Sequence, residues 1–127
     1  MDIRFRGKVR VKKFWISGDH GTIKNGDEII HTVCGCVVET ESVGQYTGKK
    51  DIFSRPIFSG DILLWQGELD GIEVKEYSAV VWDENVAGYV LESADGTLPE
   101  NLSLVHEMVV VGRVFDTPNW KELFKTR

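Results

Sequence analysis

The sequence predicts a mostly β protein, built as a small barrel or sandwich with additional strands and a short C-terminal helix. Short segments rich in β-branched residues follow one another, and turn residues recur about every eight to twelve positions. A helical pattern occurs only in the last ten or so residues. The 127 residues contain no long linker and no repeat, so we expect a single domain covering residues 1–127.

The first predicted strand covers residues 3–11, where apolar and basic residues alternate without a break. A period of two over this length is typical of a strand whose two faces differ. The basic face would carry Arg4, Arg6, Lys8, Arg10 and Lys12.

The next part of the chain predicts a turn, a strand and a loop. Asn25-Gly26 is a turn signal because both residues tolerate positive φ. Residues 28–41 predict one continuous β segment, which contains Cys34 and Cys36. Within a strand these cysteines would point the same way about 7 Å apart, too far for an unstrained disulfide. Residues 43–51 predict a glycine-punctuated loop.

The second half predicts a series of strands and the helix. In Gly60-Asp61 we expect the aspartate to accept hydrogen bonds from turn amides. Gly112 lies inside a β-branched run and predicts a bulge or bend. In the tail, Thr117 is a candidate cap, and Trp120, Leu123 and Phe124 would share one helix face. The predicted strands of this half are residues 62–65, 73–82, 88–92 and 104–114.

Charge is unevenly distributed along the chain. Residues 1–13 carry six basic and one acidic side chain, a net +5, and the remainder carries 9 basic and 19 acidic groups, a net −10. The five cations of the first strand could contact the phosphates of a nucleic acid. Equally, they could form a solvated face, a charged edge that discourages aggregation, or ion pairs with acidic groups of the same or a neighbouring subunit.

We expect no catalytic residues, no metal site and no cofactor. His31, Cys34 and Cys36, with His20 as a fourth group, lack the spacing of a zinc knuckle. Asp61 and Asp83 have no histidine nearby in sequence that would suit acid–base catalysis. A small hydrolase or metalloprotein is therefore the least favoured hypothesis, and we expect the protein not to be an enzyme.

No run approaches the roughly 18 apolar residues of a membrane helix, and the first 13 residues lack the apolar core of a signal peptide. We therefore expect a cytoplasmic protein without membrane contact.

Six segments, taken together and in this order, resemble the YopX family of phage and prophage proteins. The chain departs from the family at residues 52–55, where Ile-Phe-Ser-Arg replaces a polar turn. The resemblance implies an SH3-like barrel and homo-oligomeric assembly, and it implies no catalytic residues. The matching segments are residues 3–8, 43–48 with Lys50-Asp51, 57–62, 80–83, 88–91 and 110–118.

Two functions follow as expectations. The first is a non-enzymatic, homo-oligomeric binding or assembly module of a phage or prophage, with Gln45, Tyr46 and Thr47 as a candidate recognition loop. The alternative is a nucleic-acid-binding accessory protein that uses the five basic residues of the first strand.

Overall fold

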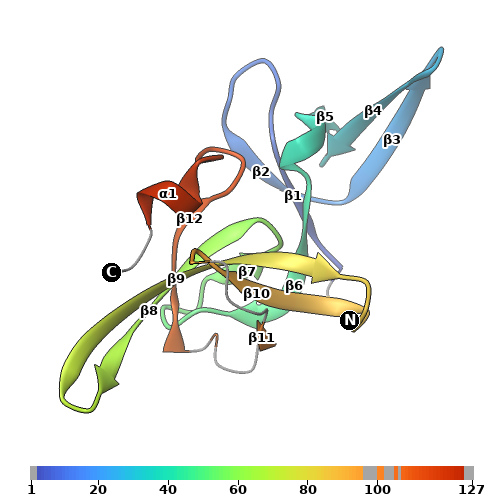
Figure 1. The fold of residues 1–127 in the computed structure, drawn as a ribbon. Coiled ribbons are helices and arrows are strands. Elements are labelled where there is room, and N and C mark those ends of the chain that lie inside the picture. The colour runs from blue at the N-terminus through green and yellow to red at the C-terminus, as the bar shows by residue number, and fades with distance from the viewer. Residues whose placement is uncertain (1–2, 96–99, 102–104, 106, 125–127) are drawn as a thin grey trace. The chain divides into compact units, whose positions relative to one another are not determined.

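The computed structural model describes residues 3–95, 100–101, 105 and 107–124. These residues form three antiparallel sheets, one of them a curled half-barrel, and a short C-terminal helix (Figure 1). The predicted mostly β class is thereby confirmed. The chain divides into two compact units, Met1–Tyr46 and Thr47–Arg127, which are described in turn. A single domain over residues 1–127 stays a prediction.

In the first unit, β1 (Phe5–Lys8) is a central strand. It pairs antiparallel with β2 (Trp15–Gly18) on one side and with the first residues of β6 (Gly44–Lys50) on the other. The predicted strand over residues 3–11 is therefore shorter than expected. After Lys8 only Val9 forms a further bridge, to Val38, and the chain then turns.

The rest of the first unit is a ribbon of β3 (His20–Asn25) and β4 (Glu28–Val33), followed by β5 (Cys36–Val37) and the 3-10 turn η1 (Thr40–Ser42). The predicted turn after Asn25 is confirmed. The continuous β segment predicted over residues 28–41 is wrong, because the chain reverses at Cys34 (φ 51°) and Gly35 (φ 78°). Both cysteines are unbridged, and Cys34 lies in this turn rather than in a strand.

The second unit contains the remainder of β6 and a five-stranded sheet with the order β11-β10-β9-β8-β12. Its sheet is covered on both faces. Leu63 and Val80 pack in a cluster with Ile57 on one face, while Ile62 and Trp120 belong to a second cluster. After β6, the strands of the second unit are β7 (Pro56–Phe58), which pairs with β6, and the five strands of this sheet. The five are β8 (Asp61–Leu69), β9 (Ile72–Asp83), β10 (Gly88–Ser93), β11 (Glu100–Asn101) and β12 (Val109–Arg113).

Sequence reasoning located β8, β9, β10 and β12 but misjudged several lengths, and it predicted neither β7 nor β11. Strand β8 continues four residues past the predicted end at Trp65, and a turn at Asp70 and Gly71 closes the hairpin with β9. The predicted bulge is confirmed, since the register between β12 and β8 shifts between Val110 and Gly112. Of the strand predicted over residues 104–114, only Val109–Arg113 is one, and residues 104 and 106 lie outside the described residues.

The C-terminal helix α1 (Trp120–Leu123) confirms the helical pattern, with two corrections. It begins after Asn119 rather than at Pro118, although the Trp120 amide donates to the Thr117 carbonyl oxygen at 3.0 Å. Trp120 is buried, but Leu123 points to solvent and does not share the packed face. The Phe124 ring stacks on that of Tyr77, with centroids 4.7 Å apart.

Candidate functional site

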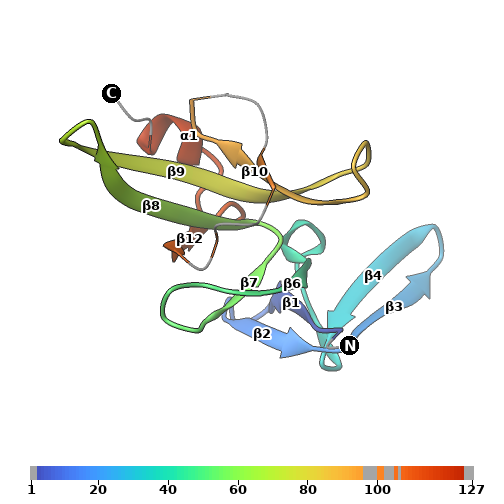
Figure 2. The same cartoon turned by 90° about the horizontal axis from the view of Figure 1, so that it is seen from below.

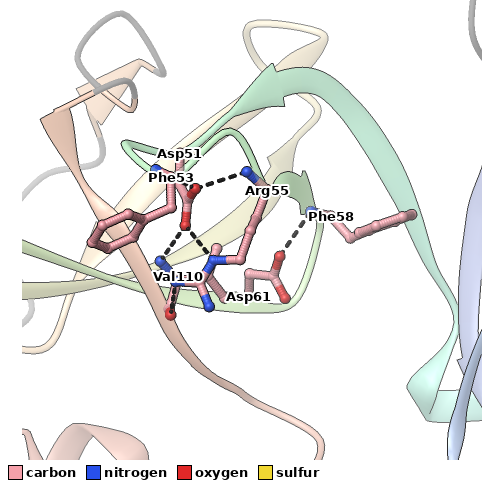
Figure 3. Close-up of polar contacts among 6 residues, drawn as sticks. All are labelled: Asp51, Phe53, Arg55, Phe58, Asp61 and Val110. Atoms are coloured by element: carbon pink, nitrogen blue, oxygen red, sulfur yellow. Dashed lines mark hydrogen bonds and ion pairs between the residues drawn. The ribbon is translucent and has the colours of Figure 1, made fainter.

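A buried aspartate organises the turn between β6 and β7. Both carboxylate oxygens of Asp51 accept two hydrogen bonds each (Figure 3). The side chain is fully buried. Oδ1 accepts from the backbone amides of Phe53 and Arg55, both at 2.9 Å. Oδ2 accepts from Arg55 Nε and from the Val110 amide, both at 3.1 Å. We call this arrangement the Asp51 clamp.

The clamp presents two apolar side chains to solvent. Ile52 is 56% exposed and Phe53 is 70% exposed, although both are next to the buried Asp51 in sequence. Arg55 also donates from Nη2 to the Val110 carbonyl oxygen, and its guanidinium lies 5.6 Å from the centre of the Phe53 ring. Ser54 adopts a left-handed backbone conformation, with φ 62°. The turn is thus held at several points while its apolar side chains remain uncovered.

The hydrogen bonds of the clamp determine the ionisation of Asp51. Burial alone would raise the pKa of its carboxyl group. Hydrogen bonds from the amides of Val110, Arg55 and Phe53, together with the Arg55 charge, outweigh burial and lower the pKa below its ordinary range. Asp51 is therefore a carboxylate at neutral pH, and its lone pairs are used to hold the turn.

The second buried aspartate, Asp61, also has the structural role predicted for it. Its Oδ2 accepts a hydrogen bond from the backbone amide of Phe58 at 2.8 Å. Gly60, which precedes Asp61, has φ 90°. The close-up shows this contact beside the clamp (Figure 3). Gly60 and Asp61 together close the turn into β8.

The basic residues in and around β1 are divided among different contacts rather than forming one solvated ridge. Arg6 is buried, and its guanidinium carbon lies 4.7 Å from the centre of the Trp15 ring. Arg4 is half-buried, 5.2 Å from the centre of the Tyr46 ring. The charged-edge interpretation is wrong, because β1 has a strand on each side.

Two further cations, Arg10 and Lys13, lie near one carboxylate. Arg10 and Lys13 are 3.9 Å and 3.3 Å from Glu39 Oε1. The Lys8 amide donates to Ser42 Oγ at 2.8 Å, while Lys12 is exposed in the turn after β1. Pairing with acidic groups of the same chain is thus observed for Arg10. Nucleic-acid binding by Arg4, Arg6, Lys8, Arg10 and Lys12 stays a prediction.

The predicted loop over residues 43–51 is wrong, because Gly44–Lys50 form strand β6. Tyr46 is buried at 8% exposure, Gln45 is half-buried and pairs with Phe5, and the Thr47 hydroxyl donates to the Ile57 carbonyl oxygen. Gly44 and Gly48 therefore lie within a strand, and of these two only Gly48 has a positive φ. Recognition through Gln45, Tyr46 and Thr47 stays a prediction.

Two histidines meet at the base of the β3–β4 ribbon. His20 Nε2 and His31 Nδ1 lie 2.9 Å apart, so one ring donates and the other accepts, and Phe5 packs on His20 with centroids 5.0 Å apart. Among the residues that the structure describes, no three His, Cys, Asp or Glu side chains gather as a metal site. Burial, and then the nearby His31, lower the pKa of His20.

This lowered pKa predicts a pH dependence of the first unit. Below about pH 6.5 the unfolded chain protonates His20 more readily than the folded chain does, so stability falls as pH decreases from there toward the lowered pKa. Histidine titration by NMR should place His20 below the ordinary value, with the signal assigned by its loss in His20→Gln. A His20 pKa above 6.5 would contradict the packing described.

Sequence reasoning missed the Asp51 clamp. One signal was present: an apolar Ile-Phe pair stands inside a turn bounded by an acid and a base four residues apart.

Among the described residues, no helix has the length and apolar character needed to cross a bilayer.

The fold and the clamp define a small, mostly β protein in which buried carboxylates hold exposed turns. The family model described as YopX protein matches residues 4–121, and the chain therefore belongs to the YopX family, whose function is unknown. No curated protein matches the chain.

Proposed function

We propose that this YopX-family protein is a non-enzymatic, homo-oligomeric binding or assembly module of a phage or prophage, acting in the cytoplasm. The observation that carries the proposal is the exposed pair Ile52 and Phe53 on a turn held by the Asp51 clamp.

We further propose that the sheet described above as a curled half-barrel belongs to an SH3-like barrel.

The energetics of the turn support a binding role. A left-handed residue other than glycine costs about 1–2 kcal/mol, and Ser54 adopts that conformation here. A solvent-exposed phenylalanine forgoes roughly 1.5–3 kcal/mol that burial would supply. The turn is therefore less stable than one with buried apolar side chains, and a partner surface that covers Ile52 and Phe53 would supply the missing burial.

Charge favours a second copy as that partner. Lys49, Lys50 and Arg55 are exposed on both sides of the apolar pair in sequence. The second unit as a whole carries 8 basic and 14 acidic residues, a net −6. A basic and apolar turn on one copy thus complements an acidic unit on another.

The double variant Ile52→Ser, Phe53→Ser tests this proposal. We expect a multimer for the wild type by light scattering and a lower mass for the variant, because the apolar contact is lost while the clamp stays intact. Val86→Ser is the matched control, since Val86 is also exposed in a turn of the second unit, at 63%. An unchanged mass in the double variant would contradict the role of this turn.

A further inference from the structure

The β3–β4 ribbon lacks the packing that usually stabilises a pair of strands. It projects from β1 and β2 in both views (Figure 1, Figure 2). Ile23 is 52% exposed and Ile29 is 56% exposed, and these two residues lie on opposite faces of the ribbon. The third strand, β5, pairs only with Thr32 and Val33 of β4, so the outer part of the ribbon is two-stranded. A two-stranded ribbon in water is marginally stable without a third strand or a covering surface. The ribbon is therefore suited to gain a neighbour.

The backbone of β3 offers an open edge to such a neighbour. The Cys34 amide donates to the Asp19 carbonyl oxygen at 2.9 Å, so alternate residues from Asp19 onward, including Ile23, face β4. The amide and carbonyl groups of Thr22 and Lys24 consequently face the other edge. Within the described residues, the sheet order β3-β4-β5 places no strand there.

We propose that two copies of this chain pair antiparallel along β3, so that Ile23 meets the partner subunit's Ile23 at a two-fold axis. In this register Thr22 exchanges hydrogen bonds with Lys24 of the partner subunit. The pairing joins two three-stranded sheets, one from each copy, into one continuous sheet. It names an interface for the homo-oligomer proposed above, and it rests on that proposal.

Side-chain complementarity selects this register. Ile23 is directly opposite Ile30 within the ribbon, so two-fold pairing builds a row of four isoleucines on one face. A shift of the paired strand by two residues in one direction would place two Lys24 side chains opposite each other, which is repulsive. The opposite shift would place Ile23 against Gly21 and Lys24 against His20, and the row of isoleucines would be lost.

The size of the edge sets the expected strength. Stable interfaces bury about 1,600 Å² in total, and one short edge buries less than that. Pairing along β3 alone should therefore be weak and should depend on protein concentration.

Cysteine cross-linking tests the register directly. In a Cys34→Ser, Cys36→Ser background, Ile23→Cys places two thiols at a non-hydrogen-bonded pair, where Cα atoms are about 4.5 Å apart and a disulfide can form. Ile29→Cys is the matched control, because it is the same residue type at similar exposure on the opposite face. We expect mild oxidation to yield covalent dimer at least about tenfold faster for Ile23→Cys, since pairing raises the local thiol concentration.

A second variant tests the hydrogen bonds. Thr22→Pro removes an outward-facing amide and leaves the β3–β4 ladder intact, so it should abolish the preference for cross-linking at position 23. Equal cross-linking at positions 23 and 29 would overturn the inference. A wild-type multimer without the preference would overturn the inference alone, whereas a monomer at every concentration would overturn the proposed function as well.

Discussion

Replacing Asp51 by alanine should lower the free energy of unfolding by at least about 1.5–3 kcal/mol, the contribution typical of a single hydrogen bond to a charged group. The carboxylate accepts four hydrogen bonds, three of them from the backbone amides of Phe53, Arg55 and Val110. Alanine supplies no acceptor, so those three amides would lose their carboxylate partner. Urea unfolding followed by tryptophan fluorescence measures the loss.

Two milder variants separate the causes. Asp51→Asn keeps one carbonyl oxygen as an acceptor, although its amide group faces the other donors. Because one acceptor remains, its loss of unfolding free energy should be smaller than that of Asp51→Ala. Arg55→Gln removes the guanidinium of a side chain that is 52% exposed, and exposed ion pairs contribute only about 0–1 kcal/mol. If Arg55→Gln costs as much as Asp51→Ala, the ion pair rather than the backbone hydrogen bonds holds the turn.

The same hydrogen bonds predict acid sensitivity. Because the pKa of Asp51 is lower in the folded protein, its contribution to stability is present above the ordinary aspartate pKa and is lost as pH falls toward the lowered value. The urea midpoint of Asp51→Ala should therefore depend less on pH in this acidic range than the wild-type midpoint does.

Gly7→Ala should give the second large loss, about 1–3 kcal/mol, as is typical of overpacking a filled core. A Cβ at Gly7 would lie 2.8 Å from Val38 Cγ1 and 2.9 Å from both Cβ and Cγ2. Val38 is fully buried, and β1 is held between two strands, so neither side can move away easily. Urea unfolding of the variant measures the effect.

A double-mutant cycle isolates this contact. Val38→Ala alone leaves a cavity and is destabilising, but combined with Gly7→Ala it provides room for the new methyl group. The two changes should therefore be less destabilising together than the sum of their separate effects, by about 0.5–3 kcal/mol. Additive losses would show that Val38 does not limit the space at Gly7.

The sequence predicted the parts of the fold that depend on local patterns. The Asn25-Gly26 turn, the bulge before Gly112 and the short C-terminal helix all follow from residue types at fixed spacing. The reversal at Cys34 and Gly35 was missed because Cys34 gives no turn signal and Gly35 is a single glycine inside an otherwise apolar run. Strand β6 was missed because its glycines are typical of loops, whereas tertiary pairing keeps Gly44–Lys50 extended.

The candidate site was less predictable because it depends on contacts between distant residues. Asp51 is 59 positions from Val110, and no local pattern joins the two. Likewise, the alternation in residues 3–11 suggested a solvated basic face, but pairing on both edges of β1 and the Trp15 ring bury Arg6. An Arg4→Glu, Arg6→Glu variant would therefore disturb packing, and Lys12→Glu is the cleaner test of nucleic-acid contact.

The mass of the wild-type protein in solution tests the central claim most directly. Light scattering over a range of protein concentrations, at low and high salt and with or without a mixed-sequence DNA fragment, should give a mass above that of the 14.3 kDa chain. We predict that the mass rises with concentration and that the DNA remains unbound. A 14.3 kDa monomer under all conditions would contradict the claim. A monomer that binds DNA only at low salt would instead favour nucleic-acid contact by the basic residues Arg4, Arg6, Lys8, Arg10 and Lys12.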